Sequence, residues 1–320
     1  MADVFAYLEG FGASGGSPNK STIIVTAPTG STVTCKMGST TKTATEKNGV
    51  WTFGGLDLGT WTITSTKGGD SATQDVAITR LTVEYVTIVY RITPQFTYTG
   101  DYAIVDDSDN PISDFASWKG NWKIRFLTSG TLTFTKLNGW NGQLDVFLVG
   151  GGGNGGTRNW NPDSSIYQHG AGGGGGYTKT QKNIPVAVGT EYSITIGSNT
   201  GTTKAFNLSA SGGANAYGNS RGWEKGGNGG SGGGATSKPG GTNGGNGIAH
   251  EYATGGTGQG TTTKEFGEEN GRLYASGGNG DKTESTAPNS GNGADGRTTG
   301  DTSTSQNPGA SGIVVIRNKR

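Results

Sequence analysis

The side chains that could support catalysis are few and widely spaced in this sequence. Cys35 is the only cysteine, and the two histidines, His169 and His250, lie far from it and from each other along the chain. One cysteine excludes intrachain disulfides and a zinc site built from several cysteines. Nucleophilic catalysis would require a Cys–His pair assembled from distant parts of the fold. No motif supports such a pair, and we therefore predict a protein that is not an enzyme.

An acidic turn is the other candidate for ion binding. Asp106, Asp107 and Asp109 lie close together in the stretch DDSDNP, and carboxylate oxygens are the ligands that Ca²⁺ prefers. The stretch lacks the glycine and the distant glutamate of an EF-hand loop. We therefore favour a solvated acidic turn over a calcium site, and we expect neither a metal nor a cofactor.

Nucleic acid and membranes are also poor partners for this chain. The GxGxxG patterns are expected by chance in so much glycine, and none opens a helix after a strand. The net charge is +1 and no run of Lys or Arg forms a basic stripe. The first residues lack the pattern of a signal peptide, and no run is long enough to span a membrane. We expect a protein made in a cytoplasm and not inserted into a membrane.

Alternating apolar and polar residues predict a β-sandwich over residues 20–92. Short runs rich in Val, Ile, Thr and Trp are separated by turn sequences at intervals of about ten residues. In TWTITS, the threonines alternate with Trp61 and Ile63, which places these two residues on a buried face. Cys35 falls within another predicted strand. The stretch VWTFGGLDLGTWTITS, Val50 to Ser65, resembles transthyretin-like and carboxypeptidase-regulatory-like sandwich repeats. This resemblance implies a spacer or presentation module without chemistry.

Glycine dominates the second half of the chain. There are 63 glycines in 320 residues, and only 17 of them precede Gly150. A polyproline-II-type helix repeats every three residues without internal hydrogen bonds, so each backbone group must pair with a neighbouring segment. A helix enclosed on all sides admits only glycine, whereas an outward face tolerates any side chain. The register GGN-GGS-GGG from Gly226 fits such helices, with Asn228 and Ser231 at the outward position.

Three other origins of the glycine content are less favourable. A flexible Gly/Ser linker would not be interrupted by apolar strands such as YSITIG and IVVIRN. Collagen requires a sustained triplet period and more than the 9 prolines present. The stretches that approximate a calcium-binding nonapeptide repeat lack the large aliphatic residue that this repeat requires. We therefore predict a mainly β protein, in which an antiparallel β-sandwich precedes a strand-framed, glycine-rich domain of packed polyglycine II helices.

The order of motifs in residues 93–320 resembles the glycine-rich domain of phage minor structural and tail-fibre proteins. The strand DVFLVG runs into GGGNGG, followed by GAGGGGGYTK, VAVGTEYSITIGS and the terminal SGIVVIRN. Glycine-helix tip adhesins of T-even-like phages and the glycine-rich region of the anaplastic lymphoma kinase receptor family are similar in kind. The resemblance implies strands over 93–149, a polyglycine II body over 150–312 and a closing strand over 313–320.

The resemblance also implies a location and partners. It indicates a virion surface protein, made in the host cytoplasm, that binds a host receptor or glycan through loops at the tip. A capsid decoration, head-fibre or matrix subunit without receptor binding is the alternative. Phage fibres make a homotrimer the default, and a single-chain tip is the other arrangement.

Aromatic residues in the insertions between glycine runs are the candidate receptor contacts, because Trp and Tyr suit stacking on sugars. The alternative is that they seal helix ends or subunit contacts. The insertion KEFGEENGRLY, Lys264 to Tyr274, is another place where large side chains are expected to project. Residues 1–19 are either a flexible terminus or an arm that docks to other virion proteins. The receptor candidates are Trp160, Tyr167, His169, Tyr217, Trp223, His250 and Tyr252, and the docking candidates are Val4, Phe5, Tyr7, Leu8 and Phe11.

Overall fold

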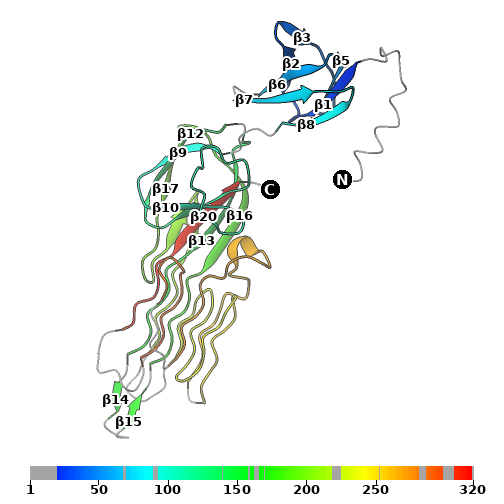
Figure 1. The fold of residues 1–320 in the computed structure, drawn as a ribbon. Coiled ribbons are helices and arrows are strands. Elements are labelled where there is room, and N and C mark those ends of the chain that lie inside the picture. Colours follow the sequence, from blue (N-terminus) through cyan, green and yellow to red (C-terminus); the bar gives the residue numbers. More distant parts are fainter. Residues whose placement is uncertain are drawn as a thin grey trace. The chain divides into compact units, whose positions relative to one another are not determined.

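The computed structural model divides the chain into two compact units (Figure 1). The first unit ends at Ile92 and the second begins at Thr93. The mainly β fold predicted from the sequence is confirmed: the described residues form strands, turns and one short 3₁₀ helix. The structure describes residues 20–67, 70–88, 93–138, 140–157, 159–161, 166–168, 170–217, 225–251, 253–280, 286–297 and 306–318.

The first unit is a β-sandwich of two four-stranded sheets. One sheet has the strand order β4-β5-β1-β8 and the other β3-β2-β6-β7. All pairs are antiparallel except β1 with β8, which are parallel. The strands are β1 (Ser21–Thr26), β2 (Thr32–Met37), β3 (Thr40–Lys42), β4 (Thr45–Lys47), β5 (Val50–Leu56), β6 (Gly59–Lys67), β7 (Asp70–Ile78) and β8 (Val83–Thr87).

The core of this unit lies between the two sheets. Trp61 and Ile63 of β6 are fully buried, as the alternation in TWTITS predicts, and Cys35 of β2 lies with them. Trp61 Nε1 donates a hydrogen bond to the carbonyl oxygen of Asp57 at 2.9 Å, so the only polar atom of this buried ring is satisfied. Phe53 of β5, in the other sheet, belongs to the same buried cluster. The interior is therefore built from aromatic and β-branched residues at alternate positions.

The second unit begins with a strand framework. A five-stranded antiparallel sheet has the order β10-β11-β20-β13-β16, and a three-stranded sheet has the order β17-β12-β9. The last described strand, β20, lies between β11 and β13 in the centre of the larger sheet. The strands are β9 (Gln95–Tyr98), β10 (Tyr102–Val105), β11 (Lys123–Phe126), β12 (Gly130–Lys136), β13 (Gln143–Val149), β16 (Thr178–Pro185), β17 (Glu191–Ile194) and β20 (Ile313–Asn318), with the hairpins β14 (Asn159–Asn161)–β15 (Ile166–Gln168) and β18 (Thr203–Ala205)–β19 (Leu208–Ala210).

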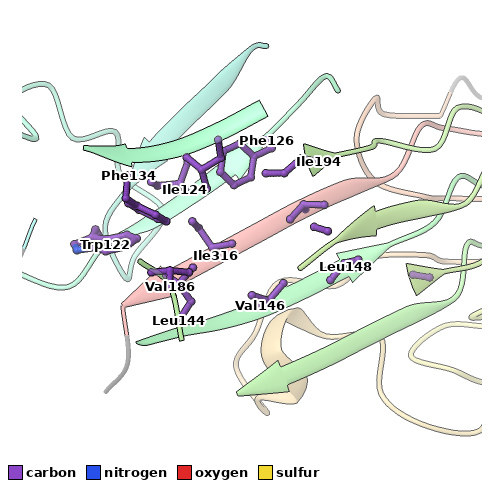
Figure 2. Packing of buried hydrophobic residues seen from close by; sticks show 14 of the residues in the cluster. Trp122, Ile124, Phe126, Phe134, Leu144, Val146, Leu148, Val186, Ile194 and Ile316 are labelled. Atoms are coloured by element: carbon purple, nitrogen blue, oxygen red, sulfur yellow. The ribbon is translucent and has the colours of Figure 1, made fainter. Parts of the chain in front are cut away.

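Both faces of the larger sheet are covered. On one face, alternate residues of β13 and β20 such as Val146 and Ile316 pack against Phe134 of the smaller sheet (Figure 2). The opposite face packs against the segment that contains the 3₁₀ helix η2 (Glu265–Gly267). Phe266 and Tyr274 of this segment are 3% and 1% exposed. The prediction that the 264–274 insertion projects its aromatic side chains outward is therefore wrong, because these side chains pack against this face of the sheet.

The glycine-rich body has hydrogen bonds that repeat every three residues. In the segment 170–177, the amides of Gly172 and Gly175 both donate to the segment 231–234. Gly173 and Gly176 donate to a second segment, and Gly174 and Tyr177 donate to a third. Successive amides therefore bond to three different neighbours, and the order repeats every three residues. This period is that of polyglycine II. The bonds are Gly172 N to Gly234 O (2.9 Å), Gly175 N to Ser231 O (2.8 Å), Gly173 N to Ala294 O (2.8 Å), Gly176 N to Gly291 O (2.7 Å), Gly174 N to Ala214 O (2.9 Å) and Tyr177 N to Ser211 O (2.9 Å).

Segment 170–177 is enclosed on every side. Counting the bonds that its carbonyls accept, its partners are segments 150–156, 211–214, 227–230, 231–234, 275–278 and 291–297. A Cβ atom at any residue from Gly172 to Gly176 would lie 1.8 to 2.2 Å from a backbone oxygen of a neighbour. No side chain fits at such distances, so the run of five glycines marks the centre of the lattice.

At the perimeter of the lattice, asparagine side chains replace missing neighbours. Asn246 Oδ1 accepts a hydrogen bond from Gly258 N at 2.7 Å, and Asn292 Oδ1 accepts one from Ser276 N at 3.0 Å. Asn228 is exposed, as its place in the glycine register predicts. Ser231 is fully buried instead, and its hydroxyl accepts a bond from Gly244 N at 3.1 Å. The outward position predicted for Ser231 is wrong, because a small side chain that satisfies a backbone amide fits inside the lattice.

Candidate binding surface

The first predicted receptor contacts lie at the end of the glycine-rich body away from the strand framework. Segment 150–156 leaves β13, and segment 170–177 returns to β16. The hairpin β14–β15 lies between them at the far end (Figure 1). Trp160 and Tyr167 are register partners in this hairpin. The backbone therefore brings two of the candidate residues to directly opposite positions.

Two further insertions are closed by short bridges at the same end. Tyr217 and Lys225 exchange backbone hydrogen bonds of 2.9 Å in both directions, and the side chain of Tyr217 is 66% exposed. His250 forms a bridge with Ala253, its carbonyl oxygen accepting a bond from Ala253 N at 3.2 Å, and the histidine is partly buried. Tyr217 thus has the exposure that receptor binding requires, whereas His250 has less.

The bases of the three insertions are hydrogen-bonded in series. Ala216 N donates to Asn154 O at 2.8 Å, which joins the second insertion to the first. Gly226 N donates to Thr254 O at 3.2 Å, which joins the second to the third. We call the end of the body that carries these three insertions the loop-bearing end, and its described residues are 154–157, 159–161, 166–168, 170–171, 216–217, 225–226, 248–251 and 253–254. Three of the candidates, His169, Trp223 and Tyr252, lie outside the described residues.

The docking candidates and Cys35 are not part of the loop-bearing end. The docking candidates Val4, Phe5, Tyr7, Leu8 and Phe11 lie outside the described residues. Cys35 is fully buried, and this burial raises the pKa of its thiol to about 11. A protonated, inaccessible thiol is a poor nucleophile.

A charged cavity lies in the strand framework of the second unit. Its volume is about 630 Å³, which is within the range of ligand pockets. The cavity is lined by the turn 107–109, by Lys123, by the loop 265–272 and by Arg317. Most of its wall is therefore charged, which distinguishes it from the apolar pockets that bind most small ligands.

Ion pairs of three buried cations adjoin this cavity, and we call them the charged floor. Lys123 and Arg317 line the cavity directly, and Arg125 is paired with the lining residues Asp109 and Glu265. Arg125 Nη2 lies 2.7 Å from Asp109 Oδ1 and 2.9 Å from Glu265 Oε2. Lys123 pairs with Asp109, and its Nζ lies 3.3 Å from Glu265 Oε1. A second group joins Arg317 to Asp145 at 3.1 Å and to Glu268 at 2.7 Å. These ion pairs connect the loop 265–272 directly to β11 and β20. Arg317 of β20 connects the loop to Asp145 of β13 in turn.

Asp109 therefore departs from the predicted solvated turn. Asp106 does form an exposed turn, since its carboxylate accepts bonds from the amides of Ser108 and Asn110. Asp109 has φ 67° and directs its carboxylate to Lys123 and Arg125. Burial alone would raise its pKa, but hydrogen bonds and charge from these two cations outweigh burial and hold the pKa below its ordinary value. Asp109 is therefore only partly solvated, with 34% of its side chain exposed, because distant strands supply its partners.

Sequence reasoning missed this charged floor, although one signal was present. Lys123 and Arg125 alternate with Ile124 and Phe126, which indicates a strand with one charged and one apolar face. The partners come from loops far along the chain and could not be chosen by pattern. Among the described residues, no group of three or more His, Cys, Asp or Glu is placed to hold a metal ion. No helix in the described part of the chain is long and apolar enough to cross a membrane.

Comparison with known proteins identifies the second unit. A family profile described as "Glycine-rich domain" matches residues 127–319. No curated protein sequence matches the chain. A crystal structure of a DUF3823 family protein from Bacteroides ovatus matches with 13% sequence identity and a TM-score of 0.19, covering 58% of this chain and 91% of that one. A likeness this weak does not bear on the fold. Because the family profile covers more than half of the sequence, the chain belongs to the glycine-rich domain family.

Proposed function

We propose that this protein is a non-enzymatic surface component of a bacteriophage virion, a fibre or adhesin protein that binds a host receptor through its loop-bearing end. The N-terminal segment 1–19 attaches it to other virion proteins in this proposal. The ligand is a host glycan or surface protein. The protein assembles as a homotrimer or acts as a single-chain tip.

The observation that carries the proposal is the hydrogen-bonded series of loop bases. The bonds from Ala216 to Asn154 and from Gly226 to Thr254 hold three insertions side by side on a frame of interlocked backbone. Binding residues are commonly displayed on loops held by a rigid scaffold. Such a frame lowers the ordering cost that a flexible loop incurs on binding.

The exposed aromatic residue at this end supports a role in recognition. Tyr217 exposes 66% of its surface directly beside a bridge that fixes its backbone. An aromatic ring on a fixed backbone offers a large contact area at low entropic cost and suits stacking against a sugar. The sequence places Trp160 and Tyr167 in the neighbouring insertion.

Binding of the purified protein to bacterial cells and to isolated cell-wall glycan tests the proposal. We expect binding by the natural chain and its loss in Trp160→Ala, Trp223→Ala and Tyr217→Ala variants. Tyr102→Ala is the matched control, because Tyr102 is an exposed tyrosine of the strand framework, 44% exposed. Binding to the virion shell alone, with no binding to cells or glycan, would contradict receptor binding and support a decoration protein.

A further inference from the structure

The first unit has an open sheet edge at β8. This strand pairs with β1 in parallel and with no other described strand. Thr22 N donates to Thr82 O at 3.0 Å, and Ile88 N donates to Thr26 O at 2.8 Å. In a parallel ladder, alternate residues of a strand bond to the same neighbour. Val83, Tyr85 and Thr87 therefore direct their amides and carbonyls away from β1, toward the open edge.

The same edge exposes apolar side chains. Val83 is 49% exposed, Tyr85 is 61% exposed, and Leu81, just before the strand, is 52% exposed. Open edges with apolar side chains invite pairing with another strand, and natural proteins usually cover or charge them. Among the described residues, the outward backbone groups of these three positions have one hydrogen-bond partner, Thr82 Oγ1, which donates to Val83 O at 3.4 Å. An added strand would pair with the outward groups and bury Val83 and Tyr85 at once.

The other edges of the sandwich are better protected. The edge strands β3 and β4 have three residues each, and short edges offer few backbone groups. The long edge strand β7 carries the exposed Asp75, whose carboxylate accepts a hydrogen bond from Thr62 Oγ1 at 2.7 Å. Among the described strands of this unit, β8 is thus the edge most suited to strand addition.

We propose that residues 4–11 of the same chain add to β8 as an antiparallel strand. The segment 1–19 joins the described fold at Lys20, immediately before β1. It contains the apolar stretch VFAYLEGF at residues 4–11, followed by GASGGSPN at residues 12–19. The first stretch supplies apolar side chains that can pack against Val83 and Tyr85, and the second is a connection rich in glycine and serine.

Geometry favours the chain's own segment over that of another copy. Thr22 of β1 is level with Val83, the first residue of β8. A connection from the start of β1 to the free side of β8 crosses two strand spacings, about 10 Å. Eight residues span up to roughly 26 Å, and a short flexible linker gives a high effective concentration. A chain that doubles back in this way runs antiparallel to β8.

This inference concerns the free protein and does not rest on receptor binding. It deepens the proposed attachment role of segment 1–19 by naming where that segment lies before assembly. A covered β8 would also prevent edge-to-edge association of free copies.

Amide exchange at Val83, Tyr85 and Thr87 in the full-length protein tests the proposal. A double variant, Ala6→Pro with Tyr7→Pro, removes two consecutive amides, one of which must face β8 in any register. The matched control, Ala13→Pro with Ser14→Pro, places two prolines in the connection. We expect protection of the three amides in the natural chain and in the control, and its loss in the first variant. Retained protection at Ile63 of β6 shows that the sandwich is folded.

Three outcomes would overturn the proposal. The first is free exchange of the three amides in the natural chain, and the second is unchanged protection in the Ala6→Pro/Tyr7→Pro variant. The third comes from sedimentation: an oligomer that dissociates in this variant would show that the strand comes from another copy. Cell and glycan binding are measured separately, so failure here leaves the receptor proposal standing.

Discussion

Asn228 Oδ1 accepts a hydrogen bond from the amide of Thr257 at a nitrogen–oxygen distance of 2.8 Å. Both residues are exposed at the perimeter of the glycine lattice. Inside the lattice, a backbone carbonyl of the next segment would occupy the position of this side-chain oxygen. An asparagine in the glycine register therefore ends the lattice on one side by satisfying an amide that has no further neighbour. The same geometry at Asn246 and Asn292 shows that the device is repeated.

We expect Asn228→Ala to lower the free energy of unfolding of the second unit by about 0.5–1 kcal/mol, the net value of one hydrogen bond. Amide exchange at Thr257 should become faster at the same time. Asn228→Asp is the matched variant, because it keeps an acceptor oxygen at the same place and should retain the protection of Thr257. Equal exchange in all three proteins would show that the bond is absent in solution.

Gly174→Ala should destabilise the second unit by at least about 3 kcal/mol or prevent its folding. The new Cβ would lie 2.1 Å from the carbonyl oxygen of Asn228, and the opposing atom belongs to the backbone, so no change of rotamer relieves the overlap. Denaturant unfolding monitored separately for each unit measures the effect. Gly54→Ala is the control, because its Cβ would meet no atom within 4 Å. A stable Gly174→Ala protein would contradict the enclosed position.

Glu265→Gln should lower the free energy of unfolding by about 3 kcal/mol, since it leaves Lys123 and Arg125 buried with only Asp109 as a counterion. Chemical denaturation of the second unit checks this value. The exposed Glu269 lies in the same loop, and Glu269→Gln should be nearly neutral. Similar losses for both variants would mean that burial of the pair does not matter.

Asp109 should make the second unit sensitive to acid. Its pKa in the folded protein is lowered, so its ionised form stabilises the fold at pH values above its unfolded pKa of about 3.9. This contribution is lost as the pH falls from there through the folded pKa. The difference in unfolding free energy between the natural chain and Asp109→Asn should therefore be constant near neutral pH and shrink below about pH 4. The control is Asp107→Asn, whose side chain is exposed. A difference that stays constant down to pH 2 would contradict the assignment.

Local pattern was sufficient for the buried face of the sandwich strands and for the kind of lattice that glycine builds. The alternation around Trp61 and Ile63 predicts their burial, because side chains of a strand alternate between its two faces. The rule that an enclosed helix admits only glycine holds at the run Gly172–Gly176, where the structure has neighbouring backbone against every residue. These conclusions depend on a residue's own segment, and the sequence contains that information.

The partners of each segment were decided only by tertiary structure. Polyglycine II has no internal hydrogen bonds, so nothing within Gly172–Gly176 specifies which segments surround it. For the same reason the register of Ser231 did not show that its hydroxyl would bond to Gly244 inside the lattice. The pairing of Asp109 with Arg125, and of Arg125 with Glu265 140 residues away, likewise required the assembled framework. Composition determined which kind of body this chain builds, and long-range hydrogen bonds and ion pairs determined how its segments are arranged.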